Sequence, residues 1–343
     1  MAASPDGMAL TAADLVKTYS QGRGKPPLRA LDGLTFSAEA GTVFGLLGPN
    51  GAGKSTTVKI LSTLSRADAG TATVAGIDVR RYPARVRRAI GFVAQKQVSD
   101  PMDTGVENLV LAGELHGMSP RAAHARADEL LDRFALTSAA RRQVKTYSGG
   151  MARKLDVAIG LMHRPDVLFL DEPTTGLDPE ARAEMWAEIE RMSRDERMTV
   201  LLTTHYLDEA DRLANRLAIV DGGRVVAEGT PEQLKSGLRG DAVVIEVRET
   251  GDIPAVLGRI AGVSALRGVA ADGRTVRARA DDGAAALPLA LGELDAAGLA
   301  VASATVSRPS LDDVYLAHTG RSFTSAHRDA GPSPAEELQE VAS

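Results

Sequence analysis

The sequence has no cysteine among its 343 residues, which excludes a disulfide framework, a thiolate metal site and a cysteine nucleophile. Aromatic residues make up only 3% of the chain, so its cores must be packed mainly with Leu, Val, Ile and Ala. No apolar run approaches the roughly 20 residues that span a bilayer. The longest runs, such as Val167–Leu170 and Met198–Leu202, have the length of strands, so we expect a cytoplasmic chain that does not cross a membrane by itself.

An excess of positive charge is also missing. The 40 Lys and Arg residues are outnumbered by 45 Asp and Glu residues, which gives a formal net charge of −5. Broad non-specific binding to nucleic acid needs a cationic surface, so this balance argues against it. The first residues contain Asp6 and lack a basic segment followed by an apolar one, which argues against a signal peptide.

The segment 9–237 alternates short apolar runs with helical patterns, as expected for an α/β domain. Buried strands are predicted at 42–47, 90–95, 167–170 and 199–203, and helices at 54–65, 120–134 and 180–194. This alternation predicts a parallel sheet with helices on both of its faces. A hairpin at Gly222 and Gly223 and a helix at 230–236 complete the domain.

A second, smaller domain is predicted at 241–320. Strands are expected at 242–248, 263–269, 275–279 and 299–306, and helices at 253–260 and 284–297. This β-α-β-β-α-β order is typical of a small α+β ferredoxin-like domain. A last helix is expected at 311–318. Residues 1–8 are predicted to form a disordered leader, and residues 321–343 a disordered acidic tail.

A phosphate-binding motif follows the predicted strand 42–47. The pattern G-x-x-x-x-G-K-[ST] is matched in full by Gly48, Pro49, Asn50, Gly51, Ala52, Gly53, Lys54 and Ser55, with Thr56 next in the helix. Glycines let backbone N–H groups surround a phosphate, and the helix N-terminus adds the positive end of its dipole. Lys54 is predicted to reach the β- and γ-phosphates, and the Ser55 hydroxyl to bind Mg²⁺. The alternative is a glycine-rich turn that only caps a helix.

Two acidic residues end the predicted strand 167–170. The carboxyl ends of parallel strands line the ligand crevice of an α/β sheet, so Asp171 is predicted to hold Mg²⁺ directly or through water. Neighbouring side chains of an extended backbone point apart, so Glu172 can face the γ-phosphate and accept a proton from the attacking water. The alternative is an acidic pair that caps a helix ahead of Pro173.

These motifs carry a resemblance to a known family. Residues from about 10 to 235 resemble the nucleotide-binding domain of ATP-binding-cassette (ABC) transporters, which has a P-loop NTPase fold. Phe169–Pro179 is similar to that family's Walker B and D-loop run, and Tyr147–Met151 resembles its signature, usually L-S-G-G-Q. Gln95 resembles the family's Q-loop glutamine, His205 its switch histidine, and Tyr19 the aromatic residue that stacks on adenine.

The resemblance implies a head-to-tail homodimer that encloses two ATP molecules with Mg²⁺. Each site would join the phosphate loop of one subunit to Ser148, Gly149 and Gly150 of the other. Gln95 would contact Mg²⁺ or the attacking water, His205 would hydrogen-bond the γ-phosphate, and Asp178 would order the dimer seam. The implied catalytic residues are Glu172, His205, Gln95 and Lys54, and the implied metal ligands are Ser55, Gln95 and Asp171.

Two residues depart from the usual signature: Tyr147 stands in place of Leu, and Met151 in place of Gln. Both flank the residues that would touch phosphate, so we expect ATP hydrolysis to survive. A methionine cannot hydrogen-bond as a glutamine does, so contacts on the ribose side are expected to differ.

The resemblance can be narrowed to one type of ABC ATP-binding subunit. Lys145–Asp156 and Pro309–Gly320 resemble the daunorubicin/doxorubicin-resistance type of ATP-binding subunit. This implies the ATP-hydrolysing motor subunit of a bacterial drug or antibiotic exporter, peripheral on the cytoplasmic face of the membrane and bound to a separate transmembrane permease. The alternatives are the ATPase of an importer, a soluble ABC protein acting on ribosomes or nucleic acid, and a nucleotide sensor whose C-terminal domain binds a regulatory ligand. A single cassette without a basic arm argues against the ribosome or nucleic acid.

Overall fold

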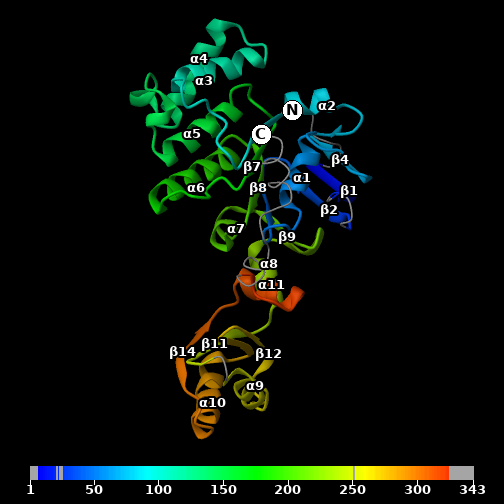
Figure 1. Ribbon diagram of the computed structural model, residues 1–343, viewed down its shortest axis with the longest axis vertical. Coiled ribbons are helices and arrows are strands. Elements are labelled where there is room, and N and C mark those ends of the chain that lie inside the picture. The colour runs from blue at the N-terminus through cyan, green and yellow to red at the C-terminus, as the bar shows by residue number, and fades with distance from the viewer. Residues whose placement is uncertain (1–6, 21, 23–25, 250–251, 324–343) are drawn as a thin grey trace. The chain divides into compact units, whose positions relative to one another are not determined.

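The computed structural model describes residues 7–20, 22, 26–249 and 252–323 and comprises two compact units (Figure 1). The first unit ends in the chain at Glu228 and the second begins at Gly229. The sequence analysis placed this boundary between residues 237 and 241, so the helix α8 (Pro231–Gly237) falls in the second unit. No helix among the described residues is long and apolar enough to cross a membrane.

The first unit is built on a six-stranded sheet with the order β10-β9-β3-β8-β7-β6. Its strands are β3 (Val43–Leu47), β6 (Ile90–Val93), β7 (Val167–Asp171), β8 (Thr199–Thr204), β9 (Arg216–Asp221) and β10 (Arg224–Gly229). Neighbouring strands from β9 to β6 run parallel, which confirms the predicted parallel sheet. All five residues of β3 and of β7 are buried, as expected for strands covered on both faces.

The helices α5 (Gly149–Gly160) and α6 (Pro179–Arg194) cover one face of this sheet, and α3 (Gly105–Leu115) and α4 (Pro120–Arg133) pack against α5 (Figure 1). The strand residues Leu168 and Leu170 pack into the apolar cluster on this side. Their neighbours Val167 and Phe169 point to the other face because side chains alternate along a strand.

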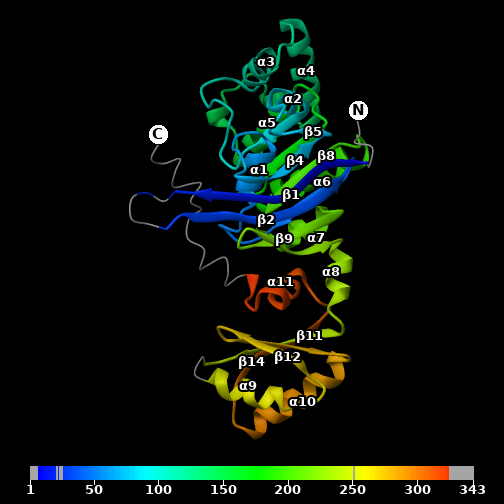
Figure 2. The same cartoon turned by 90° about the vertical axis from the view of Figure 1, so that its right-hand side faces the viewer.

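The other face is only partly covered by a helix, so the prediction of helices on both faces is incomplete there. An antiparallel sheet packs on it, with the order β2-β1-β4-β5 and the strands β1 (Met8–Tyr19), β2 (Leu28–Glu39), β4 (Ala69–Val74) and β5 (Ile77–Asp78) (Figure 2). The helix α1 (Lys54–Leu61) lies between the two sheets and adds Val58 and Ile60 to the same core. Two shorter helices, α2 (Pro83–Ala89) and α7 (Leu207–Leu213), complete the unit.

After α8, the second unit has the element order β-α-β-β-α-β, followed by a last helix. These elements are β11 (Asp241–Val247), α9 (Ile253–Ala261), β12 (Arg267–Asp272), β13 (Thr275–Ala280), α10 (Gly283–Ala296), β14 (Val301–Ser307) and α11 (Leu311–Thr319). The sheet has the order β12-β13-β11-β14, and α9 and α10 cover one of its faces (Figure 2). β12 begins later than predicted because Val263 and Leu266 pack into the core from a turn.

The helix α11 is held to the sheet by ion pairs. Arg277 of β13 lies 2.7 Å from the carboxylate of Asp312 and 3.4 Å from that of Asp313. Asp313 also closes a capping box with Ser310, which starts the helix. The fully buried Tyr315 meets the edge of Phe323 with ring centres 5.0 Å apart.

At both ends of the chain, the folded part extends further than the sequence predicted. Met8 already belongs to β1 and pairs with Glu39, and residues 1–6 of the expected leader lie outside the described residues. Ser322 and Phe323 are buried, so the expected tail does not begin at residue 321. Residues 324–343 lie outside the described part of the chain.

Candidate functional site

The predicted phosphate loop joins β3 to α1 at the carboxyl edge of the parallel sheet. Gly51 and Gly53 have φ angles of 75° and 109°, in the left-handed region that favours glycine. A Cβ on Gly48 would lie 2.4 Å from the carbonyl oxygen of Val220, so the loop packs against β9 where only glycine fits. The remaining loop residues Pro49, Asn50 and Ala52 complete the turn, and Ser55 and Thr56 continue α1.

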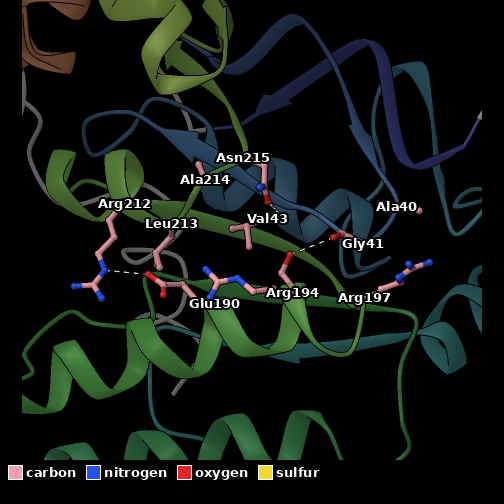
Figure 3. A pocket seen from close by; sticks show the side chains of 11 residues that line it. Ala40, Gly41, Val43, Glu190, Arg194, Arg197, Arg212, Leu213, Ala214 and Asn215 are labelled. Atoms are coloured by element: carbon pink, nitrogen blue, oxygen red, sulfur yellow. Dashed lines mark hydrogen bonds and ion pairs between the residues drawn. The ribbon is translucent and has the colours of Figure 1, made fainter.

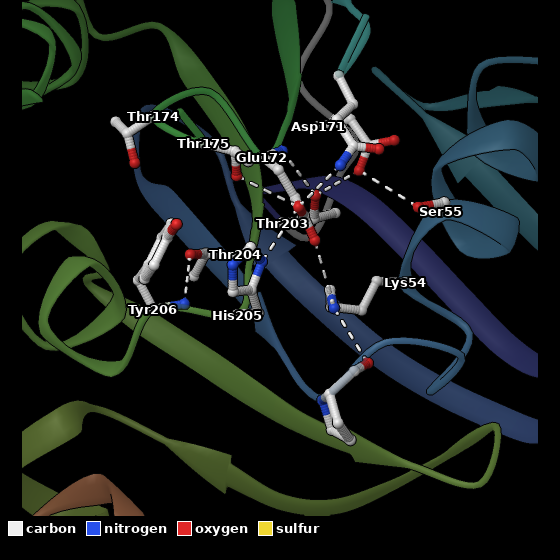
Figure 4. Close-up of polar contacts among 12 residues, drawn as sticks. Lys54, Ser55, Asp171, Glu172, Thr174, Thr175, Thr203, Thr204, His205 and Tyr206 are labelled. Atoms are coloured by element: carbon white, nitrogen blue, oxygen red, sulfur yellow. Dashed lines mark hydrogen bonds and ion pairs between the residues drawn. The ribbon is translucent and has the colours of Figure 1, made fainter. Parts of the chain in front are cut away.

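Lys54 is 4% exposed, and its side chain folds back over the loop. Its Nζ donates to the carbonyl oxygens of Gly48 at 2.6 Å and Pro49 at 3.1 Å. The same ammonium lies 3.6 Å from the Glu172 carboxylate (Figure 4). A buried ammonium at the mouth of a loop of backbone N–H groups is suited to binding phosphate oxygens.

Asp171 and Ser55 meet, as predicted for two ligands of one metal. The Ser55 Oγ lies 3.5 Å from Asp171 Oδ1, and Thr203 Oγ1 donates to the same oxygen at 2.5 Å. Burial raises the pKa of Asp171, whereas the hydrogen bond from Thr203 opposes that rise. A carboxylate beside a hydroxyl at the edge of the phosphate loop fits Mg²⁺, which prefers one or two protein oxygens together with substrate phosphates.

Glu172 is the centre of a polar cluster (Figure 4). Its Oε2 lies 3.0 Å from Nδ1 of His205 and accepts hydrogen bonds from Gln95 Nε2 at 3.2 Å and Thr175 Oγ1 at 3.3 Å. Burial alone would raise the pKa of Glu172, but the hydrogen bond to His205 and the charge of Lys54 outweigh it, so the pKa is lowered. The carboxylate is therefore ionised at neutral pH, as a proton acceptor must be.

The backbone of Glu172 is unusual. Its φ is 48°, in the left-handed region, which for a residue with a Cβ costs about 1–3 kcal/mol. Two hydrogen bonds hold its N–H at this point, to the carbonyl oxygen and to Oγ1 of Thr203, both at 3.1 Å. The strained turn directs the carboxylate away from Asp171 and toward Lys54 and His205.

Gln95 and His205 reach this cluster from the two strands on either side of β7. Gln95 follows β6 and His205 follows β8, and both strands lie within the parallel sheet that carries Asp171 at the end of β7. The carboxyl ends of parallel strands share one edge of a sheet, which is why residues distant in sequence converge there. The structure thus brings together six predicted residues: Lys54, Ser55, Gln95, Asp171, Glu172 and His205.

The signature residues are not part of this cluster. Ser148 begins α5, where its Oγ accepts a hydrogen bond from the Met151 N–H at 3.3 Å, and both Ser148 and Gly149 are exposed. Gly150 is buried, and a Cβ on it would lie 2.7 Å from the Cβ of Ala181 in α6. Tyr147 donates to the Ala139 carbonyl oxygen at 2.8 Å, so the departure from Leu adds a hydrogen bond.

Tyr19 and Asp178 also lie outside the cluster. Tyr19 ends β1, half-buried, with the Lys17 ammonium 5.4 Å from its ring centre. Asp178 is exposed and caps α6, since its Oδ1 accepts from the Ala181 N–H at 2.8 Å.

Two residues that support the site were not predicted from the sequence. Thr203 orients both Asp171 and the backbone of Glu172. Glu209 is fully buried in α7 and accepts hydrogen bonds from Thr174 Oγ1 at 2.7 Å and Trp186 Nε1 at 3.0 Å, and burial raises its pKa. An acidic residue on an otherwise apolar helix face was the available signal for Glu209.

A separate hollow of about 580 Å³ lies at the amino ends of β3 and β9, away from the phosphate loop (Figure 3). Arg194, Arg197 and Arg212 line it, and Arg212 pairs with Glu190 at 3.0 Å. None of the predicted site residues lines this hollow.

Comparisons with known proteins agree with this geometry. A family model described as ABC transporter matches residues 31–175. The daunorubicin resistance ATP-binding protein DrrA2 of Streptomyces coeruleorubidus is 46% identical over 316 residues, which cover 92% of this chain and 96% of that protein. The daunorubicin/doxorubicin resistance ATP-binding protein DrrA of Streptomyces peucetius is 46% identical over 315 residues, which cover 91% and 92%.

Among solved structures, a dimeric ATP-binding cassette in a post-hydrolysis state with ADP and Pi is similar to this chain. The TM-score is 0.59 at 25% identity, and the match covers 64% of this chain and 98% of the other. The chain therefore shares the fold of this solved ATP-binding cassette. The chain belongs to the ATP-binding proteins of ABC transporters and is of the daunorubicin/doxorubicin resistance type.

Proposed function

We propose that this ABC ATPase is the motor subunit of a bacterial drug exporter, which binds two Mg-ATP in a head-to-tail homodimer and drives a separate permease. The observation that supports hydrolysis most directly is the convergence of Lys54, Asp171 and Glu172 on one edge of the parallel sheet. A buried cation, a metal-type carboxylate and an ionised base stand together there, as phosphoryl transfer to water requires.

ATP would lie with its phosphates on the loop Gly48–Ser55. Lys54 exchanges its contacts with the loop carbonyls for the β- and γ-phosphate oxygens, and Tyr19 stacks on the adenine. Ser55, Asp171 and Gln95 would hold Mg²⁺ through their oxygen atoms, and the ion would supply positive charge next to the phosphates. His205 hydrogen-bonds the γ-phosphate from the end of β8.

Hydrolysis is then an in-line attack of water on the γ-phosphorus. Glu172 accepts the proton of that water as the new P–O bond forms, and the bond from the γ-phosphorus to the bridging oxygen breaks to leave ADP and phosphate. Glu172 is suited to this step because its carboxylate is ionised and is aimed by Gln95, Thr175 and His205. Gln95 links this step to the loop after β6 and so to a partner.

The second half of each nucleotide site would come from the partner subunit. Ser148 and Gly149 are exposed at the N-terminus of α5, where a hydroxyl, backbone N–H groups and the helix dipole favour an anion. Together with Gly150 they would meet the γ-phosphate held by the other subunit, and the exposed Asp178 would lie at the seam.

This dimer predicts a specific loss. In a Glu172→Gln background, which slows hydrolysis, Mg-ATP should convert the chain to a dimer as measured by light scattering during gel filtration. Ser148→Arg should keep the chain monomeric at the same ATP concentration, because the long arginine side chain is too large for the place of the small serine in the dimer. Ser138→Arg, on another exposed surface of the same unit, is the control and should still dimerise. ATP-dependent dimers of the Ser148→Arg protein would contradict the head-to-tail arrangement.

The export role draws on the relatives, whose names describe daunorubicin resistance. We infer that this resistance arises by removal of the drug from the cytoplasm, so the subunit would bind the cytoplasmic face of a membrane-embedded permease. The test is to co-express the chain with a candidate permease from its own genome and to prepare inverted membrane vesicles. ATP should drive daunorubicin into these vesicles, and Lys54→Ala should abolish the uptake. Drug movement out of such vesicles on addition of ATP would instead indicate an importer.

A further inference from the structure

One buried arginine contacts both the Walker B and D-loop run and the residue that precedes Gln95. Arg153 lies on α5, five residues after Ser148, and only 8% of it is exposed. Its Nε donates to the Pro173 carbonyl oxygen at 2.8 Å, and its Nη1 donates to that of Ala94 at 2.5 Å. Its Nη2 donates to the carbonyl oxygens of Asp171 at 3.1 Å and Glu172 at 3.3 Å. The three nitrogens of this guanidinium therefore make four hydrogen bonds to backbone oxygens.

Two of the four carbonyls belong to Asp171 and Glu172, and the other two belong to residues next to Glu172 and Gln95. Asp171 and Glu172 carry the metal-type carboxylate and the proposed base, and Ala94 directly precedes Gln95. Glu172 has a φ of 48°, so its backbone needs external contacts to stay in that conformation. Thr203 holds the N–H of Glu172 from β8, and Arg153 holds its carbonyl oxygen from α5.

The charge of Arg153 suits this task. Burial lowers its pKa, while the nearby carboxylates of Asp156 and Asp171 favour the charged form. A planar guanidinium with a fixed fork of donors sets the directions of several acceptors simultaneously, which a lysine ammonium cannot do. Through the contacts of Arg153 with main-chain oxygens, a shift of α5 would move the backbone of Glu172 and the residue before Gln95.

We propose that Arg153 is a positioning residue for ATP hydrolysis, which ties the helix bearing Ser148 to the backbone that aims Glu172 and Gln95. This inference rests on the proposed function, in which Glu172 accepts the proton of the attacking water. When Ser148 of this chain meets the γ-phosphate held by the partner, α5 would move. These hydrogen bonds would carry that movement to Glu172 of the same chain. Closure of the dimer and activation of the water are thereby coupled within one chain.

The test compares two replacements of Arg153 in the full-length chain. Arg153→Met should lower kcat for ATP about 10²-fold, the size of effect expected when a reacting group is displaced by about 1 Å. The Kd for a fluorescent ATP analogue should change less than about threefold, since the phosphate loop is not touched. Arg153→Lys should give an intermediate kcat, because it keeps the charge and loses the fork.

A matched control separates positioning from folding. Arg126 of α4 is as buried as Arg153, at 9% exposed, and its Nη2 donates to the Leu161 carbonyl oxygen at 3.0 Å. It contacts none of the motif residues. Arg126→Met should lower the Tm about as much as Arg153→Met, while its kcat stays within about twofold of the parent.

A double replacement tests the route through Glu172. In the Glu172→Gln protein the base is already removed, so adding Arg153→Met should lower the residual rate much less than about 10²-fold. The proposal is overturned if Arg153→Met has the kcat of Arg126→Met, or if its full loss persists in the Glu172→Gln background. A parent rate in Glu172→Gln alone would instead refute the proposed function.

Discussion

Glu172→Gln is expected to lower kcat for ATP hydrolysis about 10²–10⁴-fold, the range that a positioned proton acceptor contributes. The amide fills the same space and still accepts hydrogen bonds through its oxygen, so the contacts with Gln95 and Thr175 remain available. It has no basic oxygen to take the proton from water. Binding of Mg-ATP should persist, because Lys54 and the loop are unchanged, and a dimer that cannot hydrolyse its bridge should accumulate. Steady-state phosphate release and gel filtration with ATP measure both effects.

A second glutamate serves as the control for this replacement. Glu188 is similarly buried, pairs with Arg133 at 2.7 Å and lies on α6, outside the site. Glu188→Gln should leave kcat within about twofold of the parent, since ion pairs of this kind act on stability. If Glu172→Gln hydrolyses ATP as fast as Glu188→Gln, another group must accept the proton.

Lys54→Ala is expected to weaken Mg-ATP binding by at least about 100-fold, or about 2.7 kcal/mol, and to abolish turnover. The lost ammonium is the buried cation at the loop, where low solvent access strengthens its attraction for phosphate. The replacement also leaves the Glu172 carboxylate, 3.6 Å away, without that neighbouring positive charge. Isothermal titration with a non-hydrolysable ATP analogue and Mg²⁺ gives the affinity directly.

Lys59 offers the comparison within the same helix. It lies in the last turn of α1 and is half-buried, away from the loop. Lys59→Ala removes an equal charge from the chain, so the affinity for Mg-ATP should stay within about threefold. An equal loss in Lys54→Ala and Lys59→Ala would mean that overall charge, not the loop ammonium, holds the phosphates.

Short sequence patterns were enough to predict much of the nucleotide-binding unit. The phosphate loop, the strands around it and the acidic pair at residues 171 and 172 could be placed because each depends on residue types within a short window. Gln95, His205 and Tyr19 depended on family resemblance, since a single residue at a strand end has no local signature.

Only the tertiary structure decided how the parallel sheet is covered and what supports the site. A continuous apolar strand indicates that both faces are buried, but not that β1, β2 and β4 form the cover on one of them. Arg153 donates to the backbone carbonyl oxygen of Glu172 and Thr203 accepts from its N–H, and such contacts to a strained backbone leave no pattern in residue types. The sequence by itself determined the chemistry that each short segment offers. Convergence of those segments on Glu172 required the pairing of β6, β7 and β8, because sheet register is set by long-range packing rather than by neighbouring residues.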